Sequence, residues 1–440
     1  MTIELVYWFA AGTLSGILVG MLPGVGPSII LLSAYYFLLE ANPQMVLVFY
    51  CSMLCATQFY GSIPAIAFGV MGEITSAPAV KFGHKLMQDG YGQQAMTATA
   101  LASLLGGIIG VIGFAVALWN ITWLQALIQG WVKMLILIAL IVAIIFTSKK
   151  KIATSCMIIF GLGIGILGYQ SVFDKYFFVK SYGFGSGGIP LEVFMIGFLV
   201  LPFLIDQHKF SKQELNQKKI IIITKSKKIL LSLKNLSTIF KSSIVGFVLG
   251  LLPGLSYMIS SNAVAMIESR KTNDNFSILI AAESANNSAS IAALIPFLIF
   301  AIPVVPSEVL MLGILERDGF NSYTGKDMLS SFGTLIVLLL LTSLFINCFI
   351  AKFFYGILIR LYQNTKNFIY PMVIIFLSLI LFYIGIIENK FLLTLIVFSF
   401  SVVIGFLIKD FNVRLSAVLA SYISETLIEE IYRSWLIYIK

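Results

Sequence analysis

The chain reads Gly16-Ile-Leu-Val-Gly20-Met-Leu-Pro23-Gly24 near its start and Gly246-Phe-Val-Leu-Gly250-Leu-Leu-Pro253-Gly254 in its second half. Both stretches are apolar, and they place their glycines and their proline at the same spacing. Proline lacks a backbone N–H and glycine tolerates many backbone angles, so each Pro-Gly predicts an interrupted helix. The recurrence predicts two related halves.

The same glycines also have a simpler interpretation. A G-x-x-x-G pattern in an apolar segment usually marks close packing between helices. Interrupted helices at corresponding places in two halves, however, are the best sequence indication of a transporter's binding site. Both interpretations stay open at this point, and the doubled Pro-Gly favours the second.

The composition of the chain indicates a membrane protein. Of its 440 residues, 59% are hydrophobic and only 11% are charged, whereas soluble domains carry about 25% charged residues. We expect an all-α polytopic membrane protein with about ten to twelve membrane segments, some of them broken or re-entrant. The net charge of +9 comes from Lys and Arg between apolar segments, so it indicates a positive-inside bias and no nucleic-acid partner.

A basic stretch divides the chain. Residues 207–241 contain nine lysines and one acid, which predicts a cytoplasmic linker. The first membrane half is expected at 1–206 and the second at 242–440, in inverted orientation. The end of the second half, 414–440, mixes acidic and apolar residues at helical spacing, which favours an interfacial amphipathic helix over a final tilted span.

Polar and small residues cluster at the predicted breaks and at a second place in each half. The apolar segments contain almost no Lys or Arg, so an anion would have to be held by helix N-termini and by hydroxyl or amide groups. Polar residues inside bundles often serve only helix association. The candidate substrate-binding residues are Pro23, Gly24, Gly26, Ser28, Tyr60, Gly61, Ser62, Pro253, Gly254, Ser256, Asn262, Asn286 and Asn287.

Ionisable residues in apolar sequence are the candidates for ion coupling. These are Glu283 and Glu73, with Asn287 beside the first. Carboxylate and amide oxygens suit Na⁺, and a carboxyl group can instead carry a proton. The alternative places Glu283 at headgroup level with the asparagines capping a helix. No resident metal, cofactor or catalytic residue is expected, because both histidines, His84 and His208, fall in predicted loops.

These motifs resemble the TctA family, the large permease subunit of tripartite tricarboxylate transporters. The resemblance rests on the doubled Gly-x3-Gly-x2-Pro-Gly and on Glu283-Ser-Ala-Asn286-Asn287 followed by Pro296 and Ile302-Pro303. It implies ion-driven uptake of carboxylates, a small TctB-like membrane subunit and a TctC-like extracytoplasmic binding protein. The chain departs from the family pattern at Met71, where Pro is usual, at Ala301-Ile302-Pro303-Val304 and at Phe82-Gly83-His84-Lys85.

The sequence therefore predicts the membrane subunit of a secondary transporter in the cell (inner) membrane. It would import di- or tricarboxylates on a Na⁺ or proton gradient. A channel or a non-transporting scaffold subunit would share the same segments and remains an alternative. A membrane-embedded transferase is less favoured, because no histidine lies in an apolar segment and no acidic pair has a metal-binding spacing.

Overall fold

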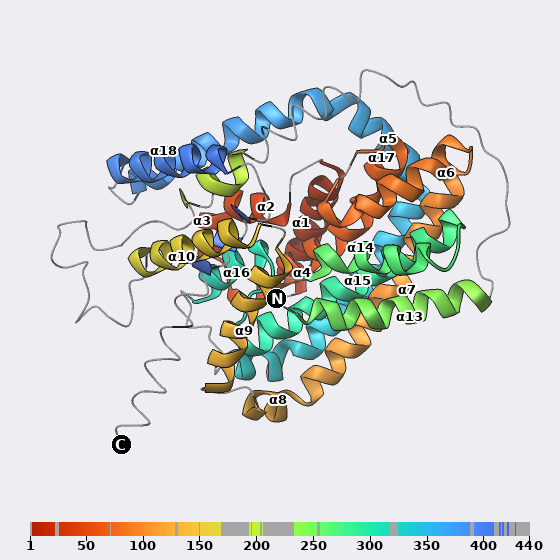
Figure 1. Cartoon of the computed structure of the whole chain (residues 1–440), viewed down its shortest axis with the longest axis horizontal. Coiled ribbons are helices and arrows are strands. Elements are labelled where there is room, and N and C mark those ends of the chain that lie inside the picture. The colour runs from red at the N-terminus through yellow and green to blue at the C-terminus, as the bar shows by residue number, and fades with distance from the viewer. Residues whose placement is uncertain are drawn as a thin grey trace. The chain divides into compact units, whose positions relative to one another are not determined.

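A computed structural model describes most of the chain, and every element in the described part is a helix (Figure 1). The described residues are 2–22, 26–70, 72–127, 131–148, 150–168, 193–194, 196–202, 205, 233–252, 256–316, 324–387, 391–408, 413–414, 416–417, 420–421 and 427. Both Pro-Gly pairs, most of the basic linker and most of the C-terminal segment lie outside them. The predicted all-α class is confirmed.

The chain forms two compact units. Unit 1 comprises 1–122, 207–307 and 311–369, and unit 2 comprises 123–206, 308–310 and 370–440. Each unit takes segments from before and after the basic linker, so the units do not coincide with the predicted halves. The division into halves stays a prediction.

Five helices are long and apolar enough to cross a membrane in the described part of the chain. They are Ile3–Met21, Pro43–Phe68, Gly92–Trp119, Asn275–Phe300 and Met328–Leu361. Shorter apolar helices occur at Met134–Phe146, Lys151–Gly165, Asn235–Gly250 and Thr394–Leu407. The predicted count of ten to twelve segments includes broken and re-entrant ones, and it stays a prediction.

Unit 1 begins with a long helix, two short helices, a second long helix and a further short helix. These are α1 (Thr2–Met21), α2 (Pro27–Ser33), α3 (Tyr35–Leu39), α4 (Pro43–Tyr60) and α5 (Ser62–Phe68). Gly16 of α1 packs directly on the backbone of Met53, and Gly20 packs on Thr57 and Gly61. Because the contacts advance along both helices together, α1 and α4 run parallel.

The chain after α5 turns back at a left-handed glycine. Gly69 has φ 71°, and its N–H donates to carbonyls of the last turn of α5. An αL residue ends a helix in this way, and glycine adopts it without strain. Short helices η1 (Ile74–Ser76), η2 (Ala79–Gly83) and α6 (His84–Gln88) follow, and then the chain enters α7 (Gly92–Trp119) and α8 (Ile121–Leu127).

After the linker the chain forms α13 (Leu233–Gly250), α14 (Ser256–Ser269) and α15 (Asn275–Phe300). The start of α13 lies inside the range assigned to the linker. Gly246 and Gly250 pack on the backbone of Ala285 and Ala289, so α13 and α15 run parallel. Glycines of α7 pack on another side of α15 in the same way, at Ser284 and Ser288.

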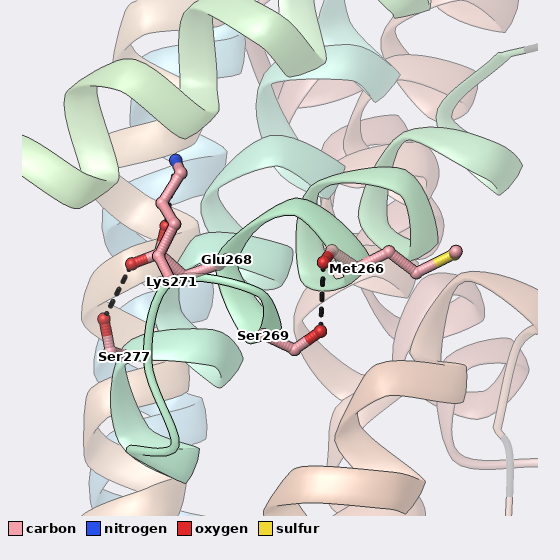
Figure 2. Close-up of polar contacts among 5 residues, drawn as sticks. All are labelled: Met266, Glu268, Ser269, Lys271 and Ser277. Atoms are coloured by element: carbon pink, nitrogen blue, oxygen red, sulfur yellow. Dashed lines mark hydrogen bonds and ion pairs between the residues drawn. The ribbon is translucent and has the colours of Figure 1, made fainter.

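The turn between α14 and α15 is held by side chains. Glu268 pairs with Lys271 at 3.4 Å and accepts a hydrogen bond of 3.2 Å from the Ser277 hydroxyl (Figure 2). Asp274 caps α15 by accepting from the N–H groups of Phe276 and Ser277. These contacts tie the end of α14 to the first turn of α15.

The two long helices α4 and α15 run antiparallel. Tyr50, early in α4, contacts Phe297 near the end of α15, with ring centroids 6.0 Å apart. Gln58, late in α4, instead contacts Asn286, in the first half of α15.

Helix α15 also ends on a left-handed residue, Ala301, with φ 52°. The N–H of Ile302 donates to the carbonyl of Pro296 at 3.0 Å, and the N–H of Val70 after α5 donates to the carbonyl of Pro64 at 3.4 Å. In both places the donating N–H lies six residues beyond the proline whose carbonyl accepts it. The two helix ends thus share one backbone arrangement.

The remaining helices are α16 (Pro306–Glu316), α17 (Thr324–Ile387), α9 (Trp131–Thr147), α10 (Lys151–Gly168), η3 (Ile196–Val200) and α18 (Phe391–Leu407). Residues 330–353 and 368–387, both apolar, belong to the single helix α17. In unit 2, Gly197 packs on Phe398 of α18, and Gly405 packs on Phe198 of η3. Unit 2 therefore uses the same close glycine packing as unit 1.

Candidate functional site

The buried carboxyl group of Glu283 lies between α15 and α5 in unit 1. Its Oε1 accepts a hydrogen bond of 2.7 Å from the hydroxyl of Ser62. The hydroxyl of Ser103, on α7, also lies beside this carboxyl. Glu283 is 3% exposed, which excludes its placement at a solvated helix surface. The structure therefore brings together two predicted site residues that lie on opposite sides of the basic linker in the sequence.

A second buried carboxyl group joins the same cluster through an amide. Gln58 of α4 donates from Nε2 to Oε2 of Glu73 at 3.2 Å. The Oε1 of Gln58 accepts from Nδ2 of Asn286 at 2.8 Å. Gln58 thus connects the chain turn after α5 with α15.

The segment carrying Glu73 reaches the cluster because Gly72 has no side chain. A Cβ atom on Gly72 would overlap the carbonyl oxygens of Gly20 and Gly61. Further along, Ser261 of α14 donates to the carbonyl of Thr75 at 2.8 Å. The segment from Gly72 to Thr75 is therefore held between the end of α1, the junction of α4 with α5, and α14.

Burial shapes the charge state of Glu73, which lies outside the long helices. Its removal from water raises the pKa of its carboxyl group to about 7, although hydrogen bonds from Gln58 and Thr75 oppose the shift. A carboxyl group with this pKa can change its charge near neutral pH.

Two oxygen acceptors of the cluster lack a hydrogen-bond donor. Among the described residues, Oε2 of Glu283 and Oδ1 of Asn286 are buried without a hydrogen-bond partner. Burying such groups unpaired is costly, and oxygen atoms are the ligands that hard cations prefer. Glu283 and Asn286 lie three residues apart on α15 and so share a helix face, which makes these two oxygens candidate ligands of a cation.

A conventional metal centre does not occur in the described part of the chain. There, no three His, Cys, Asp or Glu side chains come together as such a site would require. His84 instead contacts the carbonyl of Ile66 through Nδ1 at 3.0 Å and Gln88 through Nε2 at 3.0 Å. This histidine braces the end of α5.

The other predicted residues lie in several places. Asn287 donates to the carbonyl of Glu283 in its own helix at 3.1 Å, and the hydroxyl of Tyr60 is buried without a partner among the described residues. Gly61 lies against Glu73, whereas Gly26 precedes α2 and Ser28 is half-buried within it. Asn262 is half-buried in α14. Pro23, Gly24, Pro253 and Gly254 lie outside the described residues, as does the side chain of Ser256.

Two residues that build the cluster, Gln58 and Gly72, were not among the predicted site residues. Gln58 lies four residues before Ser62 and so is expected near it on a helical face. That spacing was the available signal for Gln58. Nothing in the local sequence indicated that Gly72 approaches Gly20.

Comparison with known proteins assigns the family. Residues 6–420 match the Tripartite tricarboxylate transporter TctA family. The chain belongs to the TctA family. This is a family of transporters and not of enzymes. The multiple apolar helices in the described part of the chain are consistent with a membrane protein of this family.

One relative of this TctA-family chain comes from Agrobacterium vitis. It is described as "Uncharacterized 52.8 kDa protein in TAR-I ttuC' 3'region", and it is 27% identical over 340 residues. The match covers 74% of this chain and 66% of the relative, just under two thirds of its length. No solved structure matches the chain significantly.

Proposed function

We propose that this chain is the membrane subunit of a secondary transporter that imports small di- or tricarboxylates on a Na⁺ or proton gradient. The observation that carries the proposal is the buried cluster of Glu283, Asn286, Gln58 and Glu73, whose unpaired oxygens fit a coupling ion. Glu283 and Asn286 supply the ion's ligands. Buried ionisable groups in membrane proteins commonly mark ion and proton pathways.

We also propose that the chain contains two inverted repeats. Three features support them: α1 runs parallel to α4, α13 runs parallel to α15, and α4 runs antiparallel to α15. The shared cap at Gly69 and Ala301 adds a matching detail to the two long helices. Inverted repeats meeting around a central site are a common basis for alternating access.

The substrate belongs beside the helix breaks and away from the carboxyl cluster. Two buried carboxyl groups would repel a carboxylate, since like charges at short range in a medium of low dielectric interact strongly. The restarts of α2 and α14 present backbone N–H groups and a partial positive charge instead. We therefore keep Gly26, Ser28, Ser256 and Asn262 as substrate candidates and move Asn286 to the ion.

The family suggests the partners. A small TctB-like membrane subunit and a TctC-like extracytoplasmic binding protein would complete the transporter. We propose both as partners of this chain, with the lipid bilayer as its solvent.

Transport in reconstituted vesicles tests the proposal. Vesicles containing the chain and its partners should accumulate labelled citrate or a dicarboxylate above its external concentration only when a Na⁺ or proton gradient is imposed. Glu283→Gln should abolish the accumulation, whereas Ser243→Ala should not, because the Ser243 hydroxyl donates to the carbonyl of Ile239 in its own helix. Equilibration that ignores both gradients would assign a channel, and absence of any flux would assign a scaffold subunit.

A further inference from the structure

We propose that Gln58 and Asn286 form a chain of two amides through which the charge of Glu73 sets the cation affinity of Glu283 and Asn286. This inference rests on the ion site of the proposed function. It assigns Gln58 and Glu73 as positioning residues that do not touch the ion.

The hydrogen bonds fix the direction of both amides. Each side-chain amide has an acceptor oxygen at one end and a donor NH₂ group at the other. Asn286 donates a hydrogen bond of 2.8 Å from its NH₂ group to Oε1 of Gln58. Gln58 in turn donates one of 3.2 Å from its own NH₂ group to Oε2 of Glu73. Oδ1 of Asn286 is therefore left without a partner among the described residues.

Turning over both side-chain amides would change which group faces the Glu283 carboxylate. If both amides turned over, Oε1 of Gln58 would face Oε2 of Glu73, and two acceptors would oppose each other. The NH₂ group of Asn286 would then be released from Gln58. Asn286 and Glu283 are three residues apart on α15 and share a helix face, so this NH₂ group could donate to the Glu283 carboxylate in place of a cation.

The charge of Glu73 selects between the two directions. An ionised Glu73 requires the NH₂ group of Gln58, because a hydrogen bond to a charged acceptor is stronger than one to a neutral acceptor. It thereby holds Oδ1 of Asn286 available and keeps a competing donor away from Glu283. A neutral side chain at position 73 removes this constraint, and the cation then has to displace the amide.

Burial makes the linkage effective. Gln58 is 1% exposed and Asn286 is 3% exposed, so bulk water does not replace the missing partners. The other groups facing the two carboxyls are hydroxyls: Thr75 of η1 beside Glu73, and Ser62 of α5 and Ser103 of α7 beside Glu283. Hydroxyl groups rotate to suit either direction of the amide chain.

The test measures cation binding without transport. The full chain is purified as wild type, Glu73→Gln, Gln58→Met and the double variant. The increase of Tm with NaCl is measured at pH 8, with choline chloride holding the ionic strength constant. Glu73→Gln should weaken the apparent Na⁺ affinity about tenfold, the size expected for one hydrogen bond to a charged group. In the Gln58→Met background the same substitution should have no further effect.

A direct electrostatic effect gives a different result. If the negative charge of Glu73 attracted the cation through space, Glu73→Gln would weaken binding equally in both backgrounds, and that outcome overturns the amide chain. Equal affinity in the wild type and in Glu73→Gln also overturns it. Asn347→Leu is the matched control, because within the described part of the chain this buried amide donates only to Ser343 of its own helix, and it should leave the affinity unchanged.

The Tm measurements identify the ion, and the vesicle measurements test the proposed function independently of them. Stabilisation by acid without any response to Na⁺ assigns a proton, and the same comparison of backgrounds then applies to the acid response. Absence of both responses in the wild type removes the ion site and this inference with it. Failure of carboxylate accumulation in vesicles, with the amide linkage intact, instead removes only the proposed substrate.

Discussion

Gly72→Ala is the most informative single change, because Gly72 lets the segment that carries Glu73 enter the cluster. An added Cβ atom would overlap the carbonyl oxygens of Gly20 and Gly61 and would approach the Cα atom of Gly61. All three are backbone atoms in close-packed helices, so no side-chain rotation can relieve the overlap. The segment itself must move.

The expected cost follows from this geometry. Overpacking a well-packed interior costs about 1–3 kcal/mol, and rigid backbone on both sides places Gly72→Ala near the upper end. At about 2 °C of Tm per kcal/mol for a large domain, the Tm should fall by roughly 6 °C. Displacement of Glu73 should also break its hydrogen bond to Gln58, so the Na⁺ affinity should fall about tenfold, as in Glu73→Gln.

The assay compares Gly72→Ala with Gly356→Ala in the purified chain. Gly356 lies in α17 with nothing within 4 Å of an added Cβ atom, so alanine there should leave the Tm equal or raise it slightly, since alanine favours a helix. Intrinsic fluorescence during heating gives the Tm, and size-exclusion chromatography verifies the fold. A Gly72→Ala protein with the Tm of the wild type would refute the close approach of Gly72 to α1.

Three further changes test other parts of the structure. Ala301→Gly should raise stability by about 1 kcal/mol, because alanine is strained at φ 52° and glycine is not; an unchanged or lower Tm would contradict the left-handed cap. Ser62→Ala should lower gradient-driven uptake by removing the 2.7 Å bond to Glu283, while Ser243→Ala should retain wild-type uptake. For Glu73, burial raises the pKa from 4.5 to about 7, so the folded chain binds more protons than the unfolded chain in this range and stability should fall as pH rises from about 5 to 7. Glu73→Gln should show a smaller fall, and equal pH profiles of Tm would exclude this role for Glu73.

The sequence predicted the all-α membrane class and several members of the cluster for good physical reasons. Sustained apolar segments require a membrane, and a glutamate inside such a segment requires a partner. Glu283, Ser62, Asn286 and Glu73 were therefore identifiable, and the structure pairs Ser62 with Glu283 and links Asn286 to Glu73 through Gln58.

The distribution of roles within the cluster could not be predicted. Successive residues of an α-helix point in directions about 100° apart, so Asn286 and Asn287 cannot both face Gln58. The choice depends on how α15 is rotated against α4, and packing of the glycines of α7 and α13 sets that rotation. The entry of Gly72 depends likewise on the fold of the whole unit, since its neighbours include Gly20 of another helix.

The close glycine contacts around α15 also limit which helices of unit 1 can slide against it. Helices α7 and α13 touch α15 backbone to backbone, so sliding at either contact would drive main-chain atoms into each other. Helices α4 and α5 contact α15 through the side chains of Tyr50, Gln58 and Ser62, so movement at this contact would break side-chain contacts without driving main-chain atoms together. We therefore expect α7, α13 and α15 to move as one body. A cation bound by Glu283 and Asn286 of α15 would then control the movement of α4 and α5 against that body.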